Sequence, residues 1–268
     1  MYLADYHTHT SCFSPDGRST VDELCQSAVQ TGLRELCITD HYDVNGWNGE
    51  PYDFSEDEYY ETLSEARERY GGELLLLIGR EIGQATQNRE LAERISSDPR
   101  LDFVIGSLHN LAGYDDFYFL DYPDIERCRT LTELYLSELR ELILLGGFDV
   151  LGHLGYPLRY IRGRAGLDFD YSGYLTEISG LYRLLISSGK GIEVNTSGLR
   201  QAFGQTMPSF DLIELYRQCG GEIITIGSDA HAAQDVGAGI AEGQEMLRAA
   251  GFEYFTVYRG RKPSFVKL

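Results

Sequence analysis

Short apolar runs alternate with longer amphipathic segments along this chain. The run 74–78 is the clearest strand, because its five consecutive apolar residues are expected of a strand buried on both faces. The clearest helix start is at Ser19, where a hydroxyl cap is followed by a carboxylate and then by apolar residues at helical spacing, and Gly32 ends that helix. The pattern predicts strands at 1–6, 35–39, 74–78, 103–106, 148–151, 191–195, 222–226 and 252–258, and helices at 19–31, 55–70, 88–97, 131–145, 171–188, 210–219 and 235–250. A polar, aromatic loop with Trp47 and Pro51 joins the second strand to the second helix.

Strand and helix alternate about seven times without a linker or low-complexity segment, which is typical of parallel βα units. A closed α/β barrel fits this pattern better than an open doubly wound sheet. The residues with metal-binding or catalytic chemistry all follow strand ends, and a barrel gathers those ends at one mouth. We therefore expect one barrel domain spanning residues 1–268.

The composition excludes some kinds of partner. The formal net charge is −19, from 42 acidic and 23 basic residues, which disfavours a nucleic acid or an anionic membrane as a partner. No apolar stretch approaches the length of a membrane span and no basic-then-apolar leader is present, so we expect a soluble, cytoplasmic protein. The five cysteines are widely spaced without a Cys-x-x-Cys pair, which argues against a disulfide framework or a zinc ribbon. Nothing in the sequence indicates the oligomeric state.

All six histidines lie just past strand-like runs. His7 and His9 end the first strand, where the two-residue period of a strand places both on one face. The other histidines are His41, His109, His153 and His231. Neutral imidazole is a common ligand of divalent transition metals, so the sequence predicts a metal site at the barrel mouth.

Carboxylates and amides follow the same strands. They are Asp40, Glu81, Asn195 and Asp229. Six imidazoles and several carboxylates exceed the needs of one four-coordinate ion, and two or three ions sharing bridging oxygens fit the number better. Glu81 or Asp229 is the expected bridge, and Zn, Mn and Fe all accept such N/O sites.

Together these motifs resemble a known family. They are 7–10 (His-Thr-His-Thr), 39–41 (Thr-Asp-His), 79–81 (Gly-Arg-Glu), 106–110 (Gly-Ser-Leu-His-Asn), 152–153 (Gly-His), 193–198 (Glu-Val-Asn-Thr-Ser-Gly) and 227–231 (Gly-Ser-Asp-Ala-His). In order and spacing they are similar to the polymerase and histidinol phosphatase (PHP) superfamily, and within it to the histidinol-phosphate phosphatases. The match spans residues 5 to 231.

The resemblance implies a distorted (β/α)7 barrel with a trinuclear metal site. It assigns His7, His9, Glu81 and Asp229 to one ion, lets Glu81 bridge to a second held by His109 and His153, and assigns His41 and His231 to the third. Some relatives have a further histidine after the opening motif. Asp16 is the candidate substitute here.

The resemblance also implies a reaction. A metal-bridging water that loses its proton near neutral pH attacks phosphorus in line with the leaving alkoxide. Asp40 or a nearby histidine such as His231 would orient the water or protonate the leaving group.

Arginines are candidates for phosphate binding, because a guanidinium donates two parallel hydrogen bonds and only three lysines are present. Arg159, Arg162 and Arg164 lie in the predicted loop after His153, and Arg200 follows Asn195. Arg162 is the first choice, and a solvated surface arginine is the alternative for each. Asn195 is a further substrate-binding candidate.

The run 114–122 is aromatic and acidic and follows His109. It is a candidate wall for a cationic amine and imidazole, and simple packing on the barrel rim is the alternative.

Three other interpretations remain. A metal-dependent amidohydrolase barrel often uses a carboxylated lysine in mid-barrel, but no lysine precedes Lys190. A PHP phosphoesterase for phosphotyrosine, a nucleotide or a sugar phosphate is the closest rival, and a non-catalytic metal-binding regulatory module comes from a different class. The stretch 195–200 favours a small phosphomonoester, L-histidinol phosphate.

Overall fold

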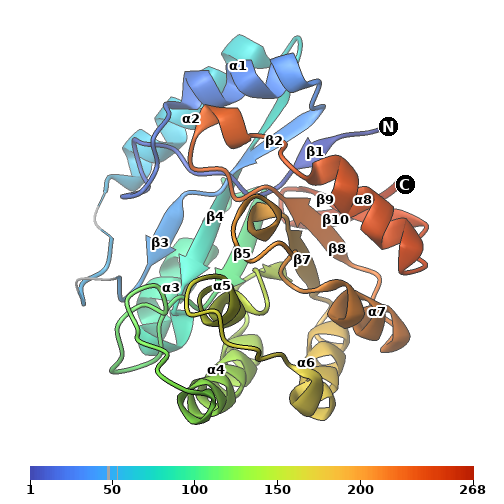
Figure 1. The fold of residues 1–268 in the computed structure, drawn as a ribbon. Coiled ribbons are helices and arrows are strands. Elements are labelled where there is room, and N and C mark those ends of the chain that lie inside the picture. Colours follow the sequence, from blue (N-terminus) through green and yellow to red (C-terminus); the bar gives the residue numbers. More distant parts are fainter. Residues whose placement is uncertain (47–48, 53) are drawn as a thin grey trace.

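Parallel strands form a ring surrounded by helices (Figure 1). The computed structural model describes residues 1–46, 49–52 and 54–268, and Trp47 of the predicted loop lies outside them. Within these residues the ring runs β1-β2-β4-β5-β6-β7-β8, and β3 continues the position of β2 beside β4. The strands of the ring are β1 (Ala4–Asp5), β2 (Glu35–Ile38), β3 (His41–Asp43), β4 (Leu75–Gly83), β5 (Phe103–Ser107), β6 (Val150–Leu151), β7 (Gly191–Asn195) and β8 (Ile224–Gly227).

Backbone hydrogen bonds join the last strand of the ring to the first. The amide of Tyr6 donates to the carbonyl of Ile226 over 3.0 Å, and further along His9 donates to Ala230 over 2.8 Å. The buried carboxylate of Asp5 reinforces this seam by accepting from the amides of Ser228 at 2.8 Å and Gly237 at 2.9 Å. The predicted (β/α)7 barrel is therefore confirmed.

The helices cover the outside of the ring (Figure 1). They are α1 (Val21–Thr31), α2 (Glu56–Tyr70), α3 (Arg89–Ser96), α4 (Ile125–Leu145), α5 (Tyr156–Gly163), α6 (Leu175–Ser187), α7 (Phe210–Gln218) and α8 (Ile240–Ala249), with short 3-10 turns at Ala85–Gln87, Ser172–Tyr174, Ser197–Arg200 and Ala233–Asp235. Helix α1 begins as predicted, since Thr20 and Glu23 form a capping box and Gly32 ends it in the left-handed conformation.

Two predicted boundaries were wrong in a way that matters for the site. Residues 156–163, predicted as loop, form α5, where Gly155 is left-handed and Pro157 stands in the first turn. Proline suits that position because it needs no hydrogen-bonded amide there. Helix α4 begins six residues earlier than predicted, because Asp124 caps it by accepting from the amide of Arg127.

The other boundary errors are smaller. The first strand was predicted at residues 1–6, with a possible continuation through His9, but its ladder covers only Ala4–Asp5 and an isolated bridge from Thr8 to Ala230 follows it. Helices α6 and α8 each begin after a separate 3-10 turn instead of running continuously from 171 and 235. Strand β3 was not predicted.

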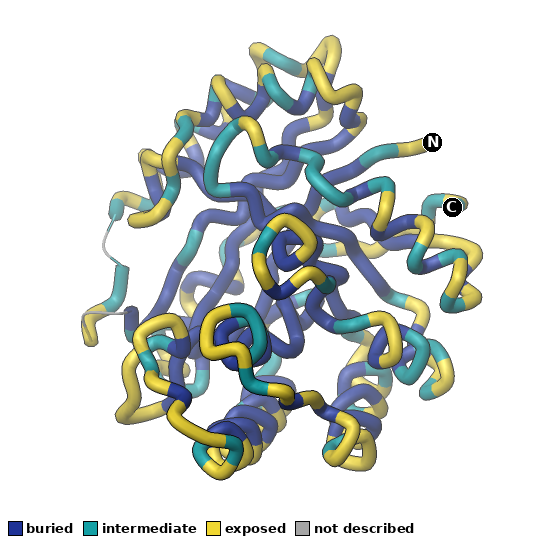
Figure 2. The backbone as a smooth tube through the Cα atoms, in the orientation of Figure 1, coloured by how far each residue is buried: buried dark blue, intermediate teal, exposed yellow. Residues whose placement is uncertain are grey.

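A C-terminal hairpin closes the end of the barrel opposite the predicted site. Strand β9 (Tyr254–Arg259), predicted as a last strand, pairs antiparallel with β10 (Lys262–Lys267), outside the ring. Tyr6 links the hairpin to the start of β2: its hydroxyl donates to Glu35 at 2.6 Å and accepts from the amide of Tyr258 at 2.8 Å. The strands between this plug and the opposite mouth are buried except at Leu75, which begins β4, and at the partly buried His41, which begins β3 (Figure 2).

The plug predicts a measurable contribution to stability. Tyr6→Phe removes one hydroxyl and leaves the buried Glu35 and the amide of Tyr258 short of a partner. The free energy of unfolding, measured by urea denaturation, should fall by about 1–3 kcal/mol. Tyr254→Phe is the matched control, because Tyr254 is exposed, and it should change stability by less than about 0.5 kcal/mol. Equal effects of the two changes would contradict the plug.

Candidate active site

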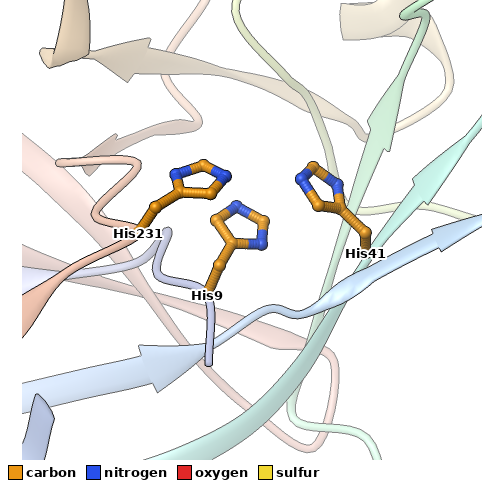
Figure 3. Close-up of side chains that lie close together, drawn as sticks. All are labelled: His9, His41 and His231. Atoms are coloured by element: carbon orange, nitrogen blue, oxygen red, sulfur yellow. The ribbon is translucent and has the colours of Figure 1, made fainter. Parts of the chain in front are cut away.

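The six histidines, though far apart in sequence, meet at the C-terminal ends of the strands. The ring of His9 lies between two others, with centroids 4.1 Å from His41 and 4.3 Å from His231, and Figure 3 shows these three rings pointing toward one another. His7 is 4.9 Å from His9 on the other side. His153 is 5.8 Å from His7 and 5.2 Å from His109. The structure therefore brings together all the histidines that the sequence nominated.

Glu81 lies at the centre of this cluster and is fully buried. Its two oxygens face different histidines. Oε1 is 2.7 Å from His153 Nε2 and 3.2 Å from His109 Nε2, whereas Oε2 is 2.7 Å from His41 Nδ1, 3.3 Å from His7 Nε2 and 3.6 Å from His9 Nε2. Glu81 is thus the carboxylate placed to bridge two ions.

Asp229 and Asp16 complete the acidic part of the cluster. Asp229 Oδ1 is 3.4 Å from His9 Nε2 and 3.7 Å from His7 Nε2, and the residue has a positive φ of 54°, a conformation in which aspartate is tolerated better than bulkier residues. Asp16 is the more exposed of the two. Its carboxylate is 3.0 Å from His231 Nε2 and 3.6 Å from His41 Nε2, where a third ion would need it.

Several buried nitrogen and oxygen atoms of the cluster, all of them potential metal ligands, lack a hydrogen-bond partner among the described residues. They are Nε2 of His7, His9 and His231, Nδ1 of His41 and Oε2 of Glu81. Buried polar atoms are nearly always satisfied, so unpaired ones that point at each other indicate an absent partner. The ligand atoms of three groups each lie within 4.8 Å of one another: His9, His41 and His231; His7, His9 and Asp229; and His41, Glu81 and His109. This nitrogen and oxygen donor set fits divalent transition metals.

The electrostatics of the cluster favour cations. Burial alone would raise the pKa of Glu81, but His7, His41 and His109 hold it well below its ordinary value. Burial lowers the pKa of His41, yet Glu81 and Asp16 outweigh it and raise the pKa to about 9. Protons on the imidazoles thus balance the carboxylates, which is the charge that bound ions would supply.

Two carboxylates that sequence reasoning missed orient the histidines from behind. Glu193 Oε1 is 2.6 Å from Nδ1 of His7, and its other oxygen accepts from the amide of His153 at 2.9 Å. Asp43 is 3.1 Å from Nδ1 of His109. Such contacts fix the ring orientation and leave Nε2 free for a metal. A signal was available, because Glu193 and Asp43 lie two residues from Asn195 and His41 on the same strand face.

Two further predicted site residues are engaged with the protein itself. Asp40 was predicted to act on the water or leaving group, but its buried carboxylate accepts from the amide of Thr10 at 2.5 Å and from Ser14 Oγ at 2.7 Å. Asn195 accepts from Ser197 Oγ at 2.6 Å and donates to Glu193 at 3.3 Å. Both therefore position neighbours of the cluster instead of facing a ligand.

The structure places the arginines differently from the prediction. Arg159, on α5, reaches the cluster, with Nη1 3.9 Å from Asp229 Oδ2. Arg162, the first choice, lies in the last turn of α5 and forms no hydrogen bond or salt bridge with the cluster among the described residues. Arg164 donates to the backbone carbonyls of Tyr118 and Leu120, and Arg200 donates to those of Ser228 and Asp229. The predicted loop gave no basis for ranking these arginines, since only a helix fixes which of these side chains face the barrel.

Ser107, which the sequence places with His109 after the same strand, also borders the cluster, and so does Tyr156, which was not predicted. Ser107 Oγ donates to Glu81 Oε1 at 2.6 Å. The ring of Tyr156 lies 5.0 Å from that of His153 and 5.3 Å from that of His109. The sequence held no separate signal for Tyr156, because its place depends on helix α5.

The described residues contain no helix long and apolar enough to cross a membrane. Comparison with known proteins agrees with the geometry of the site. The PHP domain model matches residues 5–197. A probable histidinol-phosphatase of Thermotoga maritima is 32% identical over 99% of this chain and 100% of its own length, and the histidinol-phosphatase of Lactococcus lactis is 29% identical over 98% and 96%.

A solved structure has the same fold. The histidinol phosphate phosphatase of Lactococcus lactis, complexed with zinc, L-histidinol and phosphate, superimposes with a TM-score of 0.81 at 23% identity, covering 98% of each chain. The family model covers well over half of this sequence, and the Thermotoga relative is similar along its full length. This chain belongs to the PHP domain family and is a histidinol-phosphate phosphatase-like member of it.

Proposed function

We propose that this protein hydrolyses L-histidinol phosphate to L-histidinol and phosphate, using divalent metal ions. The observation that carries the proposal is the convergence of five imidazole nitrogens on the two oxygens of the buried Glu81, of which those beside Oε2 lack a hydrogen-bond partner among the described residues. Full-length relatives named histidinol-phosphatase support the substrate, and the zinc, L-histidinol and phosphate in the Lactococcus lactis structure support both substrate and cofactor.

Three ions are the occupancy that we propose. One would be held by His7, His9 and Asp229, a second by His109 and His153, and Glu81 would bridge these two. His41, His231 and Asp16 would hold the third. His9 and His41 each lie within reach of two of these groups, so the sites share a common wall. Ions bound here would lower the pKa of a water molecule and neutralise phosphoryl oxygens.

Protein side chains would supply orientation and proton transfer. Arg159 replaces Arg162 as the proposed phosphate ligand, since its guanidinium can donate to phosphoryl oxygens beside Asp229. Arg200 holds the backbone that carries Asp229 and is proposed to act through it. With only two ions bound, His231, whose side chain is 24% exposed at the mouth, would be the proton donor to the leaving alkoxide; with the third ion bound it would be a metal ligand instead. A different phosphomonoester remains the alternative substrate.

Metal removal tests the cofactor and the substrate together. After chelation and desalting, hydrolysis of L-histidinol phosphate should be lost and the melting temperature should fall, because ions that bind only the folded state stabilise it. Adding Zn or Mn should restore both, and elemental analysis should find about two to three ions per chain. A panel of phosphotyrosine, nucleotide and sugar phosphates provides the substrate control. Full activity of the metal-free protein, or preference for another ester, would contradict the proposal.

Glu193→Gln tests the orienting carboxylates. The amide keeps the size of the side chain but loses the charge that holds Nδ1 of His7. Metal affinity, measured by competition with a chromophoric chelator, should fall about 10- to 100-fold. Glu222→Gln is the matched control, since Glu222 is exposed and precedes the neighbouring strand β8. Unchanged affinity in the first variant would remove Glu193 from this role.

Arg159→Ala and Arg162→Ala form a second matched pair. The first change should lower kcat/KM for L-histidinol phosphate by about 100-fold, the effect expected when one preorganised donor to a developing charge is lost. The second should leave kcat/KM near that of the wild type. Metal content should be the same in both proteins. A larger loss of kcat/KM in Arg162→Ala than in Arg159→Ala would identify Arg162 as the phosphate ligand.

A further inference from the structure

Asp116 is a carboxylate beside the active site that has no cationic side chain within salt-bridge distance among the described residues, although Arg159 and His109 act on it from farther away. Five other carboxylates around the cluster each lie close to a histidine nitrogen: Asp16, Asp43, Glu81, Glu193 and Asp229. Among the described residues, Asp116 forms no salt bridge, and its hydrogen bonds involve Oδ1 alone. Oδ1 accepts from the amide of Tyr118 at 2.7 Å and from the hydroxyl of Tyr156 at 3.4 Å. Oδ2 is therefore available to a ligand.

The backbone holds Asp116 next to a metal-ligand candidate. After His109 the chain turns and comes back, so that Asn110 and Asp116 form an antiparallel bridge. The amide of Phe117 donates to the carbonyl of His109 at 2.9 Å. Phe117 is fully buried and packs edge-on against Tyr135, which anchors the returning strand. The position of Asp116 is therefore set by the same backbone that sets His109.

The surroundings of Asp116 can accommodate part of a small molecule. A cavity of about 410 Å³ adjoins it, with Asn45, Asn110 and Tyr114 among the residues that line it. On the other side lies the ring of Tyr156, which contacts the cluster and is fixed by a 2.8 Å hydrogen bond from the hydroxyl of Tyr160. An apolar face beside a carboxylate suits an organic cation.

The charge balance of the pocket indicates which group Asp116 would bind. Burial raises the pKa of Asp116, and the nearby His109 offsets this only in part. A partly buried carboxylate without a cation is costly, and a ligand that supplies one recovers the cost. Phosphoryl oxygens would be repelled by Asp116 and are matched instead by Arg159 and by the metal-binding cluster. The ligand that fits both regions carries a phosphoryl group and, close to it, an ammonium group.

We propose that Asp116 binds the ammonium group of the substrate, so that the site selects aminoalkyl phosphomonoesters over phosphomonoesters without an amine. This inference rests on the proposed function and adds to it the residue that determines substrate choice. It also assigns a role to one acidic residue of the 114–122 run. The neighbouring Asp115 is exposed and is given no role in binding.

The test compares two esters that differ only in the amine. L-Histidinol phosphate and its des-amino analogue, 3-(imidazol-4-yl)propyl phosphate, are assayed at about pH 8, where a free imidazole is neutral. Asp116→Asn should lower kcat/KM for L-histidinol phosphate about 10- to 100-fold, the loss expected for a charge-assisted hydrogen bond. It should change kcat/KM for the des-amino ester by less than about twofold. Asp115→Asn is the matched control and should resemble the wild type with both esters.

Each outcome decides the proposal. Equal losses of kcat/KM with both esters would show that Asp116 supports the metal-binding or phosphate-binding groups. No loss with either ester would show that Asp116 does not contact the substrate. Both results overturn the inference and leave the proposed function intact. Metal content measured on each variant separates a folding or loading defect from a binding one. If the wild type does not hydrolyse L-histidinol phosphate, the proposed function is wrong. The same variants are then compared on O-phosphoethanolamine and ethyl phosphate, where loss of amine preference on Asp116→Asn would still support the subsite and its retention would overturn it.

Discussion

The contacts of Glu81 with five imidazoles are the interaction on which the site depends. A fully buried carboxylate is strongly disfavoured unless cations surround it, and here both oxygens are enclosed by ring nitrogens at 2.7 to 3.6 Å. Protons on the histidines can supply the balancing charge, but divalent ions do so with fixed geometry. Without cations, the buried carboxylate of Glu81 would destabilise the fold. The same need for positive charge favours metal binding in this pocket.

The barrel explains how residues from four separate segments of the chain reach one carboxylate. In the parallel register His41 stands beside Glu81, and Glu81 stands beside Ile105, two residues before Ser107. Each strand delivers its polar residue at the C-terminal end, and the seam between β8 and β1 brings His9 and Asp229 together. Because the hairpin plug and Asp5 stabilise the opposite end and the seam, the mouth can carry closely spaced charges that a less constrained loop would separate.

The sequence predicted the barrel and the histidine cluster because both depend on local, repeating signals. Apolar runs mark the strands, and a histidine or carboxylate after each run needs only the barrel topology to converge. The sequence could not rank the candidate arginines, for a different reason. Which of Arg159, Arg162 and Arg164 faces the pocket is set by the rotation of α5, a short helix whose start depends on the left-handed Gly155. Asp40 looked catalytic because it adjoins His41, but alternation along the strand turns it toward Thr10 and Ser14.

This acidic protein can bind the proposed anionic substrate because positive and negative charges occupy different parts of the pocket. Cations would occupy the centre, where Glu81 and Asp229 lie, and Arg159 extends that positive region along α5. Asp116 stands beyond His109, on a returning segment whose backbone is fixed by Phe117. A phosphomonoester without an amine would satisfy only the first region and leave Asp116 desolvated without a partner, whereas an aminoalkyl ester satisfies both. Discrimination then follows from the cost of one unpaired carboxylate, and it requires no closing loop and no change in the metal ligands.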